Sequence, residues 1–317
     1  MNFELGVEQR DFAASIDAAL TAADVPAAVR AWADGDTAPG RKVWAQLAEL
    51  GVTALAVPEE FDGLGAHPVD LVVAMEALGR WCVPGPVTES IAAGPVLLAG
   101  DHRSTALAAG DLLVTVALRP HILRAVDADS AGLILVAEGD RVSEGTAGER
   151  HDSVDPSRTL FDVAPLGDSW AADVTRAYQF GVIATAAQLV GAAQAMLDAS
   201  VEYAKQRNQF GRPIGSYQAI KHKLADVHVA VELARPLVYA AALSLADNAP
   251  ECARDVSAAK VAAGEAALLA ARSSLQTHGA IGFTAEHDLS LWLLRVQALR
   301  SAWGDPAWHR RRVLEAL

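Results

Sequence analysis

The spacing of apolar residues changes twice along the chain. From residue 7 to about 110, apolar residues such as Ala13 and Ile16 recur every three or four positions, and this spacing predicts amphipathic helices. From 111 to about 170 the pattern becomes short apolar runs bounded by Gly, Asp and Pro, which predict strands. From Thr175 onward the chain is rich in alanine and returns to helical spacing. The pattern predicts helices, then a small β region, then helices again.

Turn-forming residues divide these regions further. A proline and two glycines force a loop at 57–65, and the apolar runs at 112–118 and 132–137 are the predicted strands. In the C-terminal half, long helical segments are expected to pack side by side as a bundle. The predicted breaks between them lie at 211–213, 248–250 and 279–284.

Length and composition fit this plan. A chain of 317 residues with 52% hydrophobic and 21% charged residues can bury a large core. We therefore expect a mainly α fold with an N-terminal helical domain at 1–110, a reduced middle β domain at 111–170 and a C-terminal four-helix bundle at 171–317.

The charge balance argues against a nucleic-acid partner. The formal net charge is -13 and the pI is about 5.1, whereas nucleic-acid-binding proteins gain affinity from basic surfaces that release counterions. The one dense basic run, at 310–312, is interpreted as a solvated helix end.

Cysteine usage and the N-terminus indicate the compartment. Cys82 and Cys252 lie far apart, and neither has a second Cys or His at metal-ligand spacing, so no metal site is expected. The first residues lack the basic and apolar regions of a signal peptide, and we find no later stretch of about 18 uncharged apolar residues. We expect a cytoplasmic protein that does not cross a membrane.

Two segments of the C-terminal half carry the most specific pattern. The first, at 203–215, has the sequence YAKQRNQFGRPIG, and the second, at 276–284, has the sequence QTHGAIGFT. In this order and at this separation they resemble the acyl-CoA dehydrogenase family. The loop at 57–65 and the order of helices, strands and helices agree, so the resemblance covers most of the chain and implies that family's fold.

The chemistry of these segments suits a dinucleotide. Arginine can pair with a pyrophosphate as a forked, permanently charged donor, and phenylalanine offers a flat face to a ring system. Glycine lets backbone approach a ligand closely, and a glutamine amide both donates and accepts. The resemblance implies contacts across a subunit interface to the ADP half of a neighbour's FAD, and the matching residues are Arg207, Gln209, Phe210, Gln276, Gly279 and Ala280.

Each of these residues also has a purely structural interpretation. Arg207 could be a surface charge at a helix end, Phe210 a core residue and the glycines a turn between helices. The combination favours cofactor contact. Ala280 stands where the family usually has a second glycine, and the added methyl group narrows the approach.

The proton-abstracting glutamate of the family is missing from both of its usual positions. The reaction removes a proton α to a thioester carbonyl while hydride leaves the β-carbon for flavin N5, and it requires a carboxylate. One position falls at Trp303 and the other near Gly181, and neither residue can take a proton. Asp305 and Glu265 are the remaining candidates, although we expect Asp305 to cap a helix and Glu265 to lie in a buried hydrogen-bonded pair.

The middle region lacks the residues that hold the flavin ring in the family. There is no threonine-glutamate-proline stretch, and residues 118–121 occupy its place. The only tryptophan of this region, Trp170, follows the predicted β segment instead of lying on a strand over the flavin. A complete active site is therefore not expected in this chain alone.

This pattern of loss resembles the shorter subunits of heterotetrameric acyl-CoA dehydrogenases from actinobacterial steroid catabolism. The resemblance implies half of an α₂β₂ flavoprotein that desaturates a bulky acyl-CoA, with the base supplied by a longer partner and electrons passed to an electron-transferring flavoprotein. Two alternatives stay open. One is a self-sufficient homo-oligomeric dehydrogenase with another base such as Asp305, and the other is a noncatalytic helical scaffold.

Overall fold

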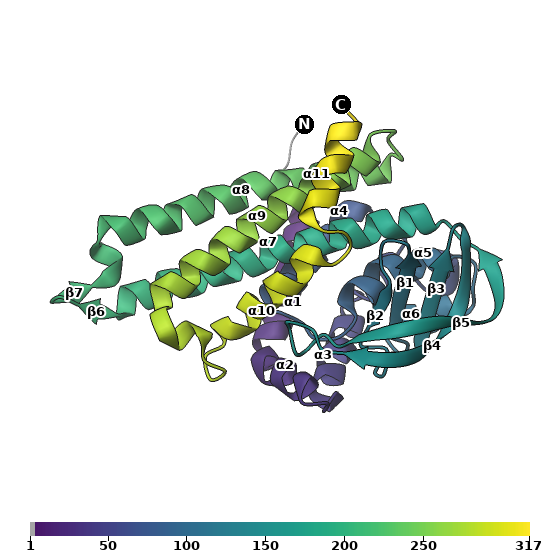
Figure 1. Cartoon of the computed structure of the whole chain (residues 1–317), viewed down its shortest axis with the longest axis horizontal. Coiled ribbons are helices and arrows are strands. Elements are labelled where there is room, and N and C mark those ends of the chain that lie inside the picture. The colour runs from purple at the N-terminus through teal and green to yellow at the C-terminus, as the bar shows by residue number, and fades with distance from the viewer. Residues whose placement is uncertain (1–3) are drawn as a thin grey trace.

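The computed structural model describes residues 4–317, and it places a small sheet beside one end of a long helical bundle (Figure 1). The predicted mainly α fold, with helices before and after the sheet, is confirmed. The N-terminal helices are α1 (Val7–Thr21), α2 (Val25–Ala33), α3 (Ala38–Glu49), α4 (Pro68–Arg80), α5 (Gly94–Leu97) and α6 (Arg103–Ala108), with single turns η1 (Glu59–Phe61) and η2 (Glu89–Ala93).

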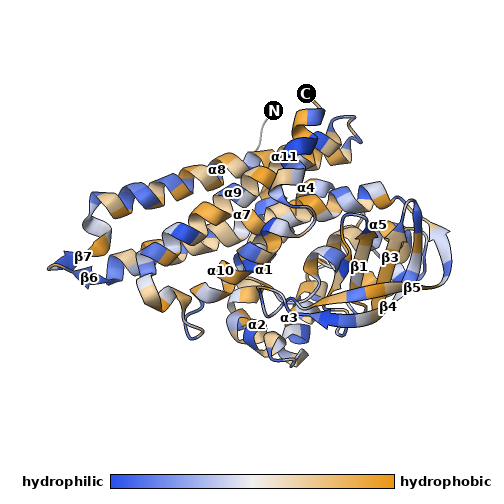
Figure 2. Ribbon diagram, in the orientation of Figure 1, coloured by the Kyte–Doolittle hydropathy of each residue, from blue (hydrophilic) through white to orange (hydrophobic). Residues whose placement is uncertain are grey.

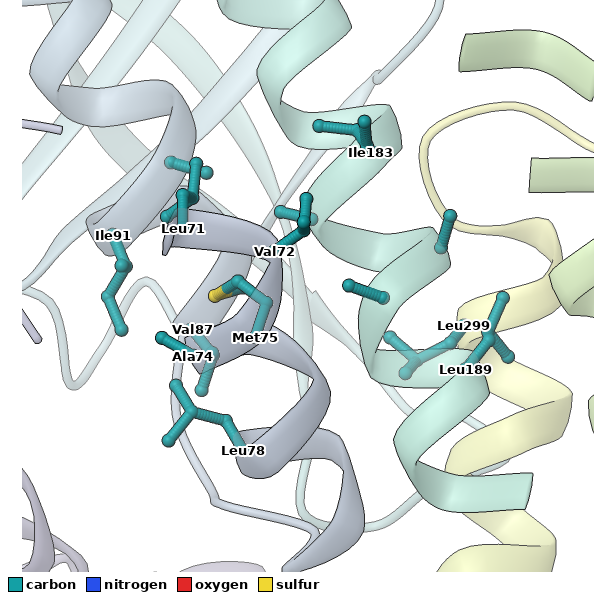
Figure 3. Packing of buried hydrophobic residues seen from close by; sticks show 14 of the residues in the cluster. Leu71, Val72, Ala74, Met75, Leu78, Val87, Ile91, Ile183, Leu189 and Leu299 are labelled. Carbon is teal, nitrogen blue, oxygen red and sulfur yellow. The ribbon is translucent and has the colours of Figure 1, made fainter. Parts of the chain in front are cut away.

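Helix α4 joins this N-terminal part to the bundle. It begins at Pro68, whose missing N–H is not needed in the first helical turn. Figure 3 shows the side chains of Leu71 and Val72 lying between Ile91 on one side and Ile183 of the long helix α7 on the other. These apolar side chains are buried, and their burial is the main favourable contribution to the contact between the two parts.

The sheet has five strands in the order β1-β3-β4-β5-β2, and only β1 and β3 run parallel. The two apolar runs predicted as strands are present as β1 and β3. Strands β4 and β5 were missed because they contain few buried positions, and Figure 2 shows mixed hydropathy along both. Strand β2 was missed because it is only three residues long. The strands are β1 (Val114–Arg119), β2 (Arg124–Val126), β3 (Leu133–Glu138), β4 (Arg141–His151) and β5 (Leu160–Ala171).

The prediction that Trp170 follows the β segment is wrong. Trp170 lies inside β5, and its indole N–H donates to Leu97 O at 3.1 Å. The guanidinium of Arg103 lies 5.3 Å from the ring centroid. The indole therefore anchors the end of the sheet to helices α5 and α6.

The C-terminal half is a bundle of long helices, with a hairpin at the end farthest from the sheet (Figure 1). The predicted breaks fall between helices, as expected from the proline and glycines there. The elements are α7 (Val174–Gln206), β6 (Asn208–Gln209), β7 (Arg212–Pro213), η3 (Ile214–Ser216), α8 (Gln218–Ala246), α9 (Cys252–His278), η4 (Gly279–Phe283), α10 (Leu289–Ser301) and α11 (Pro306–Glu315).

By length and composition alone, two helices, α7 and α8, are long and apolar enough to cross a membrane. The number rises to three if the bent pair α1–α2 is counted as one span. The sequence pattern did not reveal α7 as such a helix because glutamine and threonine interrupt its apolar run. Its 18-residue apolar window is 89% buried inside the protein, so α7 is the central core helix. The corresponding window of α8 is only 44% buried.

Candidate functional site

The hairpin at the end of the bundle presents an exposed aromatic ring. Strand β6 pairs antiparallel with β7, and Phe210 and Gly211 form the turn with φ angles of 52° and 80°. The left-handed conformation is unusual for phenylalanine, and the Phe210 side chain is 94% exposed. The ring of Phe210 thus gains no burial within its own chain in return for the strained backbone.

Arg207 lies directly before this hairpin, at the C-terminus of α7. Its backbone N–H donates to Tyr203 O at 2.9 Å, and its carbonyl accepts from the N–H of Ile214 at 2.8 Å. Within residues 4–317 its exposed guanidinium has no hydrogen bond, ion pair or ring contact. The backbone of Arg207 is thus fixed, while its permanently charged guanidinium is available to an external anion. The neighbouring Gln209 amide donates only to the carbonyl of Asn208, at 2.8 Å.

The end of α9 lies next to the hairpin. The imidazole of His278 stacks on the ring of Tyr203 with a centroid separation of 4.3 Å, which ties α9 to α7. Lys223 of α8 donates to the amide oxygen of Gln276. Gly279 has a φ of 70°, and a Cβ there would meet no atom within 4 Å. The structure thus places both predicted cofactor segments, with the exposed Ala280, on the same end of the bundle.

The two positions predicted for the family's base touch each other at the opposite end of α7. A Cβ added to Gly181 would lie only 2.1 Å from Cζ3 of Trp303, so the indole occupies the space that a side chain at 181 would need. Trp303 is 3% exposed. Positions 181 and 303 are therefore in contact although they are far apart in the sequence.

Three hydrogen bonds hold Trp303 in this place. Its indole N–H donates to Glu89 Oε1 at 3.2 Å, and its carbonyl accepts from Tyr178 Oη at 2.8 Å and from His309 Nε2 at 2.9 Å. Burial lowers the pKa of His309 to about 4, so the ring is neutral near pH 7. The Nε2–H tautomer donates to Trp303, and Nδ1 accepts from Ser257 Oγ at 3.1 Å. These bonds stabilise the positive φ of Trp303, which is 61°.

Glu89 is the residue of this region that sequence reasoning missed. It begins the π-helical turn η2, its side chain is 2% exposed, and its Oε2 atom has no hydrogen-bond partner. It lines a cavity of about 470 Å³ together with His121, Arg158 and Trp303. π-helical turns recur at functional sites. Glu89 stands between Thr88 and Ser90 in the sequence, so no local apolar pattern marked it as a buried residue.

The loop after β1 covers part of this region with aromatic contacts. Residues 118–121 stand where the family carries its ring-binding stretch, and the imidazole of His121 lies 5.2 Å from the ring of Tyr178 and 5.0 Å from that of Trp308. Burial, followed by the charge of Arg312, lowers the pKa of His121. The loop therefore contacts the bundle through the ring of His121.

The two weak candidates for the base have structural roles. Asp305 caps α11, because its Oδ1 accepts from the N–H groups of Ala307 and Trp308 at 2.8 and 2.9 Å, as predicted. The expectation that Glu265 is buried is wrong. Its carboxylate is exposed and pairs with Arg310 of α11, because this side of α9 faces outward in the chain.

One group of three possible metal ligands occurs within residues 4–317, formed by Glu149, His151 and Asp162 on β4 and β5. Asp162 already pairs with Arg124 at 2.8 Å and with His151 at 3.0 Å. The pKa of the Asp162 carboxyl is lowered, first by the hydrogen bond from Arg124. These contacts form an ion-pair cluster on the surface, and we assign no metal to it.

Comparison with known proteins gives a consistent result. Residues 7–105 match the acyl-CoA dehydrogenase N-terminal domain, and residues 171–317 match the C-terminal domain. The chain is 35% identical over 301 residues to the acyl-CoA dehydrogenase IpdE2 of Mycobacterium tuberculosis, covering 91% of this chain and 90% of that protein.

Solved structures show the same fold. A variant of the steroid acyl-CoA dehydrogenase Tcur3481–Tcur3483 superposes with a TM-score of 0.87 at 21% identity, covering 98% of both chains. The ChsE4–ChsE5 complex of Mycobacterium tuberculosis superposes with a TM-score of 0.86 at 23% identity, covering 99% of this chain and 98% of the other.

Proposed function

This chain belongs to the acyl-CoA dehydrogenase family, and we propose that it is one subunit of a heteromeric FAD-dependent enzyme whose longer partner supplies the catalytic base. In this proposal the complex desaturates the α,β bond of a bulky, steroid-derived acyl-CoA. Two similar structures support it, since one is a steroid acyl-CoA dehydrogenase and the other is a complex named for two different proteins. An electron-transferring flavoprotein is the proposed electron acceptor.

The contact between Gly181 and Trp303 is the observation that carries the proposal. Proton abstraction needs a carboxylate close to the substrate α-carbon. In this chain the indole of Trp303 fills one of the two base positions and packs against Gly181 at the other. The indole lies so close that no side chain would fit at position 181. The Asp305 carboxylate accepts hydrogen bonds from two backbone N–H groups and is therefore used to cap α11.

The residues at the other end of the bundle fit the ADP half of FAD. The unpaired guanidinium of Arg207 suits a pyrophosphate, the exposed ring of Phe210 suits a planar heterocycle, and the open space at Gly279 admits a close approach. When bound, FAD supplies the acceptor for the hydride that leaves the substrate β-carbon.

Geometry supports a cofactor shared between chains. Gly181 lies near the start of α7 and Arg207 just beyond its end, so at about 1.5 Å per residue roughly 40 Å separates them. One dinucleotide cannot contact both ends. This separation supports the proposal that FAD bound by Arg207 and Gln276 belongs to a site whose base and ring platform lie in another chain.

A second candidate function rests on Glu89. Its unpartnered Oε2 lies beside Trp303, in the wall of the cavity of about 470 Å³, and a buried carboxylate there could act as a base. On this alternative the chain is self-sufficient. The indole N–H of Trp303 already donates to Glu89 Oε1, and this bond favours a structural role for the carboxylate instead.

The experiment compares the chain alone with the chain co-purified with a candidate longer subunit. We expect little FAD on the chain alone, bound FAD and turnover in the complex, and loss of turnover by roughly 10²–10⁴-fold when the partner's base glutamate becomes Gln. Glu89→Gln should leave turnover within a few-fold at equal flavin loading. Full FAD occupancy and turnover by the chain alone, lost in Glu89→Gln, would establish the second candidate instead.

A further inference from the structure

The cavity beside Trp303 contains a buried arginine that the proposed function does not use. Arg158 lines this cavity of about 470 Å³ and is only 3% exposed. Within residues 4–317 its guanidinium makes no hydrogen bond and no ion pair. An arginine this deeply buried is normally paired with an anion, because removing a charge from water is costly. Its donors are therefore free to bind an anion in the cavity.

Two buried carboxyl groups lie near Arg158 but do not bind it. Asp155 pairs with Arg295. Asp127 Oδ1 accepts from the N–H and the hydroxyl group of Thr159 at 2.8 and 2.9 Å, and its Oδ2 has no hydrogen-bond partner. Burial raises the pKa of Asp127 to about 7, so near neutral pH this carboxyl group only partly balances the charge of Arg158.

The rest of the cavity is mostly apolar. Its lining includes Ile122, Val126, Leu160 and Trp303. Small-molecule sites of this size combine apolar walls with a few polar groups that fix the orientation of the ligand. Apolar walls favour an organic anion over a hydrated inorganic one, and a rigid ring system loses less conformational freedom on binding than a flexible chain does.

A second polar group lines the same cavity. Glu89 is 2% exposed, and its Oε2 atom has no hydrogen-bond partner. This oxygen accepts hydrogen bonds and suits a hydroxyl group of a ligand, whereas the forked guanidinium of Arg158 suits a carboxylate. We propose that the cavity binds a free alicyclic carboxylic acid, whose carboxylate pairs with Arg158 and whose hydroxyl group donates to Glu89.

This proposal rests on the proposed function in one respect, because a chain without a base leaves the cavity free for a ligand that is not turned over. A self-sufficient dehydrogenase would instead need the space beside Trp303 for an acyl thioester, and a thioester carbonyl has no charge to offer Arg158. Hydrolysis of a bulky thioester releases an acid of the proposed class. The ligand is thus chemically related to the proposed substrate without being one.

The test measures binding to the full chain by isothermal titration calorimetry, with rigid probes of similar size. We expect adamantanecarboxylate to bind about tenfold or more tightly than adamantanecarboxamide, which is neutral. Hydroxyadamantanecarboxylate should bind more tightly still. Inorganic phosphate should bind more weakly than either acid, because it has no apolar body. The N-acetylcysteamine thioester of adamantanecarboxylic acid should also bind more weakly than the free acid.

Substitutions assign the two contacts. Arg158→Gln should weaken the binding of both acids about tenfold or more, and Arg158→Lys should recover part of the affinity. Glu89→Gln should remove only the advantage of the hydroxylated acid, because an amide nitrogen cannot accept a hydrogen bond. Arg124 also lines the cavity but already pairs with Asp162 at 2.8 Å, so Arg124→Gln is the matched control and should change neither affinity.

Three results would overturn the proposal: equal affinity for the acid and the carboxamide, tighter binding of phosphate or of the thioester than of the acid, or a loss of binding in Arg124→Gln but not in Arg158→Gln. If circular dichroism shows that Arg158→Gln does not fold, Ser301→Trp replaces it. Ser301 is exposed and lines the cavity, so the added indole should block both acids, and unchanged binding would exclude this cavity. FAD and turnover on the chain alone would contradict the proposed function, while the calorimetry still decides the acid site.

Discussion

Replacing Trp303 by alanine is expected to destabilise the folded chain by about 3–5 kcal/mol, the usual cost of a large-to-small change in a core. The indole is buried against Gly181, which has no side chain that could move into the space left behind. The cavity would therefore remain, and the loss should lie toward the upper end of that range.

Part of the cost comes from a hydrogen bond. The indole N–H donates to Glu89 Oε1, and Oε2 of the same carboxylate has no partner. Removing the donor leaves both oxygens buried and unpaired, at a cost of about 1–3 kcal/mol. Trp303→Phe separates the two contributions, because it keeps most of the ring but removes the N–H. We expect it to cost about 1–3 kcal/mol by the same reasoning.

The measurement is urea unfolding at pH 7, followed by circular dichroism at one fixed chain concentration, because association would raise the apparent stability. The midpoint and the slope should both be fitted for wild type and the two variants. A loss below about 1 kcal/mol for Trp303→Ala would refute the claim that the indole fills this site, since partial relaxation rarely removes so much of the cost. The space beside Gly181 would then be available to a substrate, and the argument that this chain lacks a base would no longer hold.

Substitutions at four other residues give testable predictions. Arg207→Ala should weaken FAD binding to the assembled complex by about 1.5–3 kcal/mol, measured as the flavin dissociation constant; Arg207→Lys should recover part of it, and an unchanged constant would exclude the contact. Gly181→Ala should lower the unfolding midpoint in urea, because its methyl group would meet the Trp303 ring; an unchanged midpoint would contradict the close contact between these two residues. Asp305→Asn should retain most of the cap, cost less than about 1 kcal/mol and leave turnover within a few-fold; a loss of about 10²-fold or more at full flavin loading would make Asp305 the base. Burial lowers the pKa of His309 from 6.5 to about 4, so below pH 6.5 the unfolded chain binds a proton that the folded chain does not, and stability should fall as pH drops from 6.5 to 4. His309→Gln should flatten that part of the profile, and identical profiles would rule out this linkage.

The fold could be predicted where apolar spacing is unambiguous. Strands β1 and β3 are continuous apolar runs, and the breaks on either side of α9 coincide with Pro250 and Gly279. Strands β4 and β5 were not predicted, because their outer halves are exposed on both faces and show no period of two. Hydrogen bonding across the sheet, which no local pattern encodes, defines them.

The site could be predicted only in part. Arg207 and Phe210 follow from a contiguous motif, whereas the meeting of Gly181 with Trp303 depends on how two distant helices pack. Glu265 was expected to be buried because alanines surround it in sequence, but helical geometry turns it to the outside. Glu89 was missed for the opposite reason, since a glutamate between a threonine and a serine resembles a surface position until the fold encloses it.

The close packing of Gly181 against Trp303 restricts which substitutions this chain can accept at either position. A glutamate introduced at 303 would face an empty space opposite Gly181, and a glutamate introduced at 181 would collide with the indole. Either substitution made alone would therefore give a poorly packed protein. On the proposed function, two changes would therefore be needed together before this chain could supply a base at this place.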